Sequence, residues 1–483
     1  METINGKIEY ILFPKKGQPQ PDNGFTIASL KPEGKGSNVI IKGCIPGVRT
    51  DMNISVTGEM KTDRFGTHLA VSSYEEIIPT SSEGMKNYLA SGLVSGLGDK
   101  LAERIVSEFG EDTMRIIEEE PERLLEVKGI SEKKMQAIVS AWAEQQAVKD
   151  VMLFLKTYNV GNANAAKIYK EYGSDAISIL KTNPYTMADD IKGIGFLTAD
   201  TIAMAMGIDR RSPDRVRSAI LYMMKDSSEK EGHVYHTFGQ LTNNVLPLLN
   251  NGDVAEEDLV TDDDVTARLE GMKDAKLIIS EESDGERLYL PMFYYAERNV
   301  AQKISLLCRE KVKNHPIDFD KLESQNGIEY DSVQKDAITL ASRSRFCVIT
   351  GGPGTGKTTT MKGVIDEARS RGLKILLAAP TGRASRRLAE TTGAEAKTIH
   401  RLLEYKPGEG FGKNEEDPLS GNLLVVDESS MIDTMLMHSL LKAVPLSMRV
   451  VLVGDVDQLP SVGAGNILRD IIESECVPVV RLT

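Results

Sequence analysis

The stretch Arg345–Thr360, RFCVITGGPGTGKTTT, joins an apolar segment to a glycine-rich loop. RFCVIT predicts a buried strand, and the residues after the loop have helical periodicity. Between them, Gly351–Thr358 satisfies the pattern G-x-x-x-x-G-K-[ST] in the strand-loop-helix context that the pattern requires. Backbone N–H groups of such a loop surround nucleotide phosphates, the lysine reaches the outer phosphates, and the hydroxyl can ligate Mg²⁺. The stretch therefore predicts a nucleoside triphosphate site in a parallel α/β domain. The loop residues expected to bind the nucleotide are Gly352, Pro353, Gly354, Thr355, Gly356, Lys357 and Thr358.

Two later strands end in polar residues that suit the same chemistry. LLVVDESSMID is an apolar strand that ends in Asp427 and Glu428, about 70 residues past the loop. Asp427 is placed to hold Mg²⁺ through water, and Glu428 to orient and polarise the attacking water. VVLVGDVDQ brings Gln458 to the same sheet edge, where its amide can contact the terminal phosphate and report its loss to a neighbouring domain. Together with Lys357, these residues are the predicted catalytic set.

The length and composition of the chain limit the remaining classes. Its 483 residues favour about three or four domains, and no apolar run is long enough to span a bilayer. The start, METINGKIEYILF, lacks the pattern of a leader or transit peptide, so we expect a cytoplasmic protein with no membrane partner. The four scattered cysteines predict reduced core thiols. A net charge of -13 argues against nucleic-acid binding through a broad positive field, so any DNA contact must be local.

A repeat precedes the nucleotide-binding region. Glycine turns at Gly96, Gly129, Gly161 and Gly193 are separated by 33, 32 and 32 residues, each flanked by helical periodicity. A longer match overlays FGEDTMRIIEEEPERLLEVKGI on YGSDAISILKTNPYTMADDIKGI, which indicates one two-hairpin unit duplicated. The pattern resembles the helix-hairpin-helix family, in which backbone N–H groups at a turn approach a DNA phosphate. The alternative is that these glycines form ordinary turns of a helical scaffold. The acidic run 118–120 is interpreted separately, as a solvated helix face.

The regions on either side of the repeat have their own patterns. Residues 1–80 alternate short β-like stretches with Gly, Pro and Asn turns, which predicts a small OB-like barrel, with single-strand binding left open. Residues 212–320 contain two helical stretches and a hairpin turn at Asp284–Gly285, an order that suits a winged-helix-like module. Such a module either binds DNA or joins domains. Residues 406–418, KPGEGFGKNEEDP, predict a mobile loop.

With AAPTGRASRRL, DSVQKDAI and TIHRLL, the motifs resemble superfamily 1 DNA helicases, specifically the RecD-like branch in its long form with an N-terminal helix-hairpin-helix extension. The resemblance covers essentially the whole chain and implies a multidomain fold. Its parts are a small OB-like β-barrel domain (1–80), α-helical tandem helix-hairpin-helix repeats (81–211), a winged-helix-like α+β connecting module (212–320) and a first α/β RecA-like motor domain with a parallel sheet (321–483).

The resemblance also implies residue roles and cofactors. Gln334 matches the glutamine that reads adenine, Thr359 extends the phosphate loop, and Gln458 matches the γ-phosphate sensor. The segment that touches single-stranded DNA in this family is matched by Pro380, Thr381, Gly382 and Arg383. ATP and Mg²⁺ are the implied cofactors. As alternatives, Gln334 could be an exposed helix residue and Arg383 a surface charge.

The implied activity is ATP-dependent unwinding of DNA in repair or recombination, with 5′ to 3′ movement of a monomer on single strands and at duplex junctions. In the family, the strand that reads VPVVRLT here precedes a segment that carries the arginine of the second motor domain. We therefore expect these 483 residues alone to bind nucleotide weakly, hydrolyse it slowly and not unwind duplex DNA. The competing hypothesis is a DNA-structure-binding adaptor that uses nucleotide only as a switch.

Overall fold

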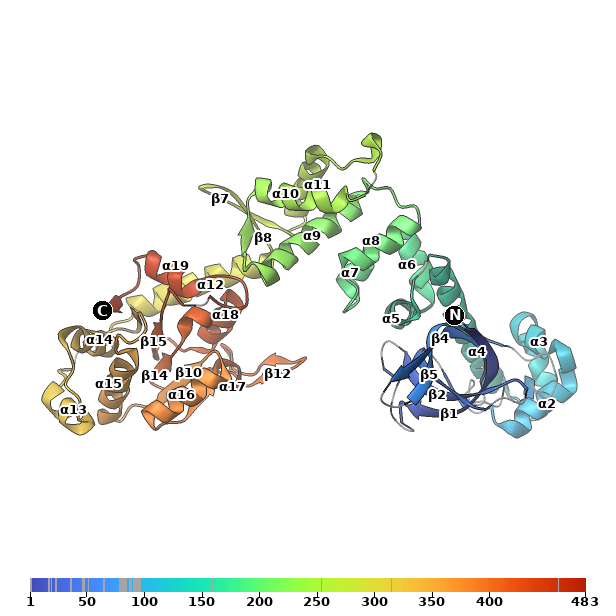
Figure 1. The fold of residues 1–483 in the computed structure, drawn as a ribbon, viewed down its shortest axis with the longest axis horizontal. Helices are drawn as coiled ribbons and strands as arrows, with labels where there is room; N and C mark the ends of the chain where they lie inside the picture. Colours follow the sequence, from blue (N-terminus) through green and yellow to red (C-terminus); the bar gives the residue numbers. More distant parts are fainter. Residues whose placement is uncertain are drawn as a thin grey trace. The chain divides into compact units, whose positions relative to one another are not determined.

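The computed structural model describes most of the chain, in two compact units. The described residues are 2–15, 18, 20, 21, 24–34, 37–45, 48–50, 52–63, 66–77, 85, 86, 89, 97–158, 160–252, 254–313, 315–458 and 460–483. One unit comprises residues 1–218 and the other residues 219–483, and each is considered by itself (Figure 1). No helix in the described part of the chain is long and apolar enough to cross a membrane.

The first unit begins with a closed barrel, which confirms the predicted OB-like domain. The order around the barrel is β1-β2-β3-β5-β4, and its inside is filled by apolar side chains such as Ile8, Leu30 and Leu69. Strands β1 and β4 contain glycines where neighbouring backbone comes close: a Cβ on Gly58 would lie 2.2 Å from the carbonyl oxygen of Ala70. The strands are β1 (Glu2–Phe13), β2 (Phe25–Pro32), β3 (Val39–Cys44), β4 (Asn53–Asp63) and β5 (Gly66–Glu76).

Helices that repeat one arrangement follow the barrel, which confirms the predicted helix-hairpin-helix duplication. Gly110 and Gly173 both end a helix with φ 56°, and each is followed by a short 3-10 segment and a second helix. Arg104 donates to the carbonyl of Lys128 at 2.9 Å, and Lys167, at the equivalent place, donates to that of Gly193 at 3.4 Å. The helices are α2 (Asp99–Phe109), α3 (Thr113–Glu119), α4 (Glu132–Thr157), α5 (Asn162–Tyr172), α6 (Ala176–Thr182), α7 (Thr186–Asp190) and α8 (Phe196–Ala205).

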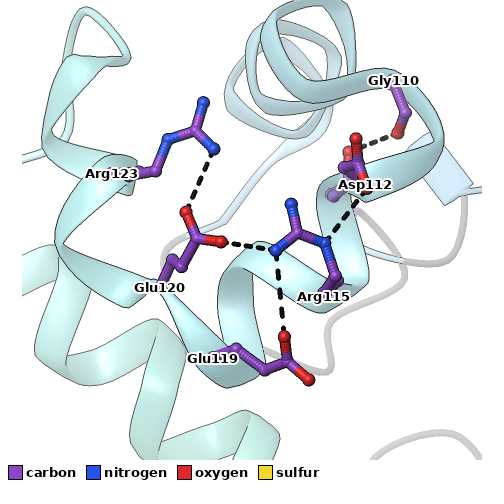
Figure 2. Close-up of polar contacts among 7 residues, drawn as sticks. Gly110, Asp112, Arg115, Glu119, Glu120 and Arg123 are labelled. Carbon is purple, nitrogen blue, oxygen red and sulfur yellow. Dashed lines mark hydrogen bonds and ion pairs between the residues drawn. The ribbon is translucent and has the colours of Figure 1, made fainter.

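The acidic run 118–120 has structural partners, so its interpretation as a solvated face is incomplete. Figure 2 shows Arg115 between Asp112, Glu119 and Glu120, with Arg123 3.2 Å from the other oxygen of Glu120. The guanidinium groups of Arg115 and Arg123 hold the pKa of Glu120 below its usual range. In the same run, Glu118 accepts a hydrogen bond of 2.9 Å from the indole of Trp142 on α4. The run thus links α3 to the next 3-10 segment, Pro121–Glu126, and to α4.

The second unit begins with the part of the connecting module that we call the joining module, residues 219–290. Thr237 forms a capping box with Gln240 that begins α10, and Gly285 has φ 96° at the turn of the β7-β8 hairpin, as the Asp284–Gly285 signal predicts. The two expected helices and the hairpin are present, with a further helix, α11, between them that the sequence pattern did not predict. The elements are the end of α9 (Pro213–Lys230), β6 (Tyr235–His236), α10 (Phe238–Leu249), α11 (Asp262–Asp274), β7 (Ile279–Ser283) and β8 (Gly285–Tyr289).

The motor domain is a parallel sheet in the order β11-β10-β14-β15-β9-β16, with helices on both faces. Its last strand, β16, pairs with β9 from Val479 to Leu482, which confirms the strand predicted in VPVVRLT. The strands are β9 (Phe346–Gly351), β10 (Ile375–Ala379), β11 (Ala396–Thr398), β14 (Leu423–Val426), β15 (Arg449–Gly454) and β16 (Val479–Leu482). The helices are α13 (Phe319–Asn326), α14 (Ser332–Arg343), α15 (Lys357–Ser370), α16 (Gly382–Thr392), α17 (Ile399–Leu402), α18 (Thr434–Ala443) and α19 (Ile467–Glu473).

Residues 406–418, predicted as a mobile loop, form part of a hairpin. Strands β12 (Tyr405–Lys406) and β13 (Gly410–Phe411) pair antiparallel, and the rings of Tyr405 and Phe411 have centroids 5.1 Å apart. Gly408 and Gly410 both have φ 86°, so the turn needs the glycines that made the segment look like a loop. The prediction of a mobile loop is therefore wrong for the paired residues 406, 410 and 411.

Helix α12 (Pro291–Arg309) lies between the joining module and the motor in sequence but packs into the motor. Its side chains Val300, Ile304 and Leu307 belong to the core cluster on the α18 face of the sheet. The domain boundaries expected from the sequence, with a change near residue 320, stay predictions.

A carboxyl pair at α12 gives a prediction for stability. Burial and the nearby carboxylate of Asp470 on α19 raise the pKa of Glu297 to about 7, with Glu281 adding to the shift and Arg287 opposing it. Because the folded pKa lies above the unfolded one, ionisation of Glu297 opposes folding as the pH rises through this window. We expect Glu297→Gln to raise the melting temperature at pH 8 and to leave it nearly unchanged near pH 5. The pKa shift limits the gain in the free energy of unfolding to about 3 kcal/mol. Melting curves over this range test it, with the exposed Glu310→Gln as control; a gain independent of pH would contradict it.

Candidate nucleotide site

The phosphate loop leaves the end of β9 and enters α15 in an open, glycine-dependent conformation. Gly354 and Gly356 have φ 81° and 83°, in the left-handed region that favours glycine. The ammonium of Lys357 donates to the carbonyls of Gly351 and Gly352 at 2.6 and 2.7 Å, so it spans the loop where phosphates would lie. Thr355 closes the loop with a 2.9 Å bond to Gly352. Thr358 is exposed and Thr359 half-buried at the start of α15, and Pro353 in the loop is exposed.

Gln334 lies against this loop. The pair Asp331 and Gln334 forms a capping box that begins α14, with bonds of 2.8 and 3.2 Å. A Cβ added to Gly356 would lie 2.5 Å from Nε2 of Gln334, so the amide sits directly over the loop. The cap holds the Gln334 side chain in place, whereas a freely exposed helix residue would have no such partner. Its role in reading adenine stays a prediction.

The acidic pair follows β14 at the same edge of the sheet. Asp427 accepts a 2.9 Å hydrogen bond from the backbone N–H of Glu428, which has a left-handed φ of 51°. Burial raises the pKa of Asp427, the Glu428 carboxylate adds to this, and Arg387 and Lys357 oppose it. Asp427 supplies a half-buried carboxylate and Thr358 an exposed hydroxyl, which are the hard oxygen ligands that Mg²⁺ prefers. These residues therefore fit the implied metal.

A buried aspartate connects the loop to the sensor. Asp455, 2% exposed, lies 3.9 Å from the ammonium of Lys357 and accepts a 3.2 Å hydrogen bond from Nε2 of Gln458. It also accepts a 3.1 Å bond from the backbone of Asp457. Asp455 thus holds Lys357 and Gln458 in one contact chain. This role of Asp455 was not predicted, because a residue that follows an apolar strand looks like an ordinary strand end in the sequence.

The segment predicted to touch single-stranded DNA begins α16. Thr381 caps the helix by accepting from the N–H of Ala384 at 3.2 Å, after Pro380 at the end of β10. Arg383 lines a hollow of about 560 Å³ together with Gly382, Arg386, Arg387 and Glu390. The guanidinium groups make this a local positive surface on an acidic protein, and DNA contact at this surface stays a prediction. Arg386 and Arg387 were not in the predicted set, although ASRRL places them one and two residues after Ser385.

The four hairpin glycines do not share one conformation. Gly129 and Gly193 have φ 102° and 86°, whereas Gly161 has φ -66° and caps α5. Gly96 lies outside the described residues. Positive φ occurs at Gly129 and Gly193, the second turn of each repeat, and this is also where Arg104 and Lys167 approach. DNA contact at any of the hairpins stays a prediction.

Comparisons with known proteins agree with this order of domains. Four family models match: the OB-fold domain of the ATP-dependent DNA helicase YrrC (residues 1–79), a SAM-like helix-hairpin-helix tandem (88–144), the helix-hairpin-helix domain of ATP-dependent RecD2 DNA helicase (144–235) and an AAA domain (334–464). All four lie in the order that the structure shows.

Curated relatives show the same likeness. The ATP-dependent RecD2 DNA helicase of Deinococcus radiodurans is 34% identical over 474 residues, which is 96% of this chain and 65% of that protein. The RecBCD enzyme subunit RecD of Mycobacterium tuberculosis is 36% identical over 213 residues, which is 39% of this chain and 36% of that protein. A crystal structure of Pif1 helicase from Candida albicans matches 32% of this chain and 40% of its own, at 22% identity and a TM-score of 0.26, too low to support an argument.

Proposed function

The chain belongs to the RecD-like family of DNA helicases, and from that premise we propose that its motor domain binds and hydrolyses ATP to drive movement on single-stranded DNA. The observation that carries the proposal is the contact chain Lys357, Asp455 and Gln458, beside the acidic pair. The buried carboxylate of Asp455 contacts both the ammonium of Lys357, which can reach a phosphate, and the amide of Gln458. A change at the phosphate can therefore be passed to the sensor.

The residues of the chain divide the work of hydrolysis. Lys357 leaves the carbonyls of Gly351 and Gly352 and binds the outer phosphates, which removes its charge from Asp455. Glu428 orients the attacking water and accepts its proton. Gln458 binds the terminal phosphate and returns to Asp455 after the phosphate leaves. Mg²⁺, when bound by Asp427 and Thr358, neutralises charge on the phosphates.

The direct test measures ATP hydrolysis and duplex unwinding by the purified protein that contains residues 1–483. We expect ATP hydrolysis to rise when single-stranded DNA is added and duplexes with a 5′ tail to be unwound faster than duplexes with a 3′ tail. Equal unwinding of both tails would contradict the proposed 5′ to 3′ direction. Nucleotide binding without any DNA-dependent hydrolysis would instead favour an adaptor. Action at duplex junctions, the monomeric state, a cytoplasmic location and a role in repair or recombination belong to the same proposal.

The hairpins give a second prediction. We expect Gly193→Ala to weaken DNA binding about 3- to 10-fold, because φ 86° strains alanine and its Cβ would lie 3.0 Å from the ammonium of Lys167. The turn would shift and its backbone N–H groups would lose a phosphate. The control is Gly173→Ala, which also has positive φ but nothing within 4 Å of an added Cβ. Anisotropy of labelled single-stranded and forked DNA measures it, and equal losses in both variants would show general strain.

A further inference from the structure

We propose that the joining module is a working part of the nucleotide sensor, because it is hydrogen-bonded to the loop that follows Gln458 in the chain. This inference rests on the proposed ATP chemistry. Residues Pro460–Asn466, here the sensor loop, follow Gln458 and Leu459 directly in the chain. The N–H of Gly465 donates a 2.9 Å hydrogen bond to the carbonyl of Gly232 in the joining module. The sensor loop therefore has a fixed partner outside the parallel sheet.

The sensor loop is built to approach its neighbours closely. Gly465 has φ 97°, and a Cβ there would lie 1.9 Å from Oγ1 of Thr434 and 3.5 Å from Cγ1 of Val234. A Cβ on Gly463 would lie 2.5 Å from a carboxylate oxygen of Asp433. Only glycine fits at either place without displacing these atoms. The loop is thus packed between the start of α18 and the joining module.

The sensor loop also behaves as one braced piece. The hydroxyl oxygen of Ser461 lies 2.8 Å from the carbonyl oxygens of both Gly463 and Gly465, and its one hydrogen can be donated to either. At its motor side, the N–H of Thr434 donates to the carbonyl of Ala464 at 2.9 Å. These bonds hold residues 461–465 together, so in the proposed coupling a displacement that reaches the start of the loop from Gln458 moves Gly465 with it.

The joining module receives the loop at an anchored point. Gly232 lies just after α9, where the N–H of Glu231 bonds to the carbonyl of Ser227 at 2.9 Å. The hydroxyl of Ser227 lies 2.6 Å from Nε2 of His236, in β6, and both residues are buried. Strand β6 pairs with β8. A shift at Gly232 therefore reaches α9 and the three-stranded sheet of the module.

Space beside the contact allows it to change. A cavity of about 680 Å³ is lined from one side by residues 230–235 and from the other by sensor-loop residues including Pro460 and Val462. Val462 is 88% exposed. The sensor loop and residues 230–235 meet at a small backbone contact beside the cavity. Such a contact can change its geometry more easily than a close-packed interface. Gln458 and Gly232 are then the two ends of one coupling, and Gly465 is a positioning residue for the sensor.

The test follows amide hydrogen exchange of residues 231–236 with and without ATPγS. In the wild-type protein we expect exchange in this segment to change at least twofold when ATPγS binds. Gln458→Ala should lose that change even at ATPγS concentrations that saturate the variant, with saturation checked by titration. Binding of ATPγS with no change in segment 231–236 of the wild type overturns the inference alone. A wild type that does not bind ATPγS overturns the proposed function and this inference with it.

Loop variants separate coupling from general damage. Gly465→Ala should lose the exchange response and lower kcat for ATP about 10-fold while KM and ATPγS affinity stay within twofold. Thr434→Ala combined with Gly465→Ala should restore the response, because the atom 1.9 Å away is removed. Gly252→Ala, with positive φ and nothing within 4 Å of an added Cβ, is the control for strain. Equal losses in Gly252→Ala and Gly465→Ala would overturn the proposed coupling; should Gly465→Ala not fold, Gln458→Ala decides.

Discussion

Replacing Lys357 by alanine is expected to weaken binding of an ATP analogue about 10- to 100-fold and to reduce hydrolysis to background. The Lys357 ammonium lies 2.6 and 2.7 Å from the carbonyls that line the loop, so it is already placed to meet the phosphates. A hydrogen bond from a charged donor contributes about 1.5–3 kcal/mol, which corresponds to the expected loss of affinity. Titration with a fluorescent ATP analogue measures binding, and phosphate release measures hydrolysis.

The same replacement should alter the protein before any nucleotide is added. Asp455 is 2% exposed and would lose its cationic neighbour, keeping the hydrogen bonds from Gln458 and Asp457. We therefore expect a lower melting temperature for the nucleotide-free variant. Lys362→Ala, on the same helix α15, is the control and should bind within twofold of the wild type. Unchanged affinity in Lys357→Ala would mean that the nucleotide lies elsewhere.

The parts of this site that the sequence predicts are those whose chemistry is local. A strand, a glycine loop and a helix are adjacent in the chain, so Gly351–Thr358 predicts both the fold around it and the place of Lys357. Asp427 and Glu428 follow an apolar strand, and parallel strands bring their ends to one edge. The repeat was equally visible because duplication preserves spacing, and the structure shows the two copies in the paired contacts of Arg104 and Lys167.

The parts that the sequence did not predict depend on contacts between distant segments. The pairing of Asp455 with Lys357 joins residues 98 positions apart, and no local pattern distinguishes it from an ordinary strand end. The packing of α12 into the motor depends on which apolar face meets α18, which periodicity alone leaves open. Gly232 and Gly465 are both surrounded by turn-like sequence, so their hydrogen bond could be found only in three dimensions.

Replacing Glu428 by glutamine is expected to lower kcat for ATP hydrolysis about 10²- to 10⁴-fold while ATP binding is retained. Glutamine keeps the volume of the side chain and its polarity but cannot accept the proton of the attacking water. Residue 428 has a left-handed φ of 51°, and glutamine tolerates it as well as glutamate because both carry the same Cβ. Single-turnover hydrolysis and analogue binding, measured on the same preparation, separate the two effects. Glu416→Gln, an exposed residue of the same domain, is the control.

The Mg²⁺ concentration needed for activity distinguishes whether Glu428 orients the attacking water or binds the metal. The Glu428 carboxylate helps to raise the pKa of Asp427, so its neutralisation should lower that pKa and leave Asp427 more readily ionised. We therefore expect the Mg²⁺ concentration for half-maximal activity to stay equal or fall in Glu428→Gln, and to rise in Asp427→Asn. A higher Mg²⁺ requirement in Glu428→Gln would assign Glu428 to the metal.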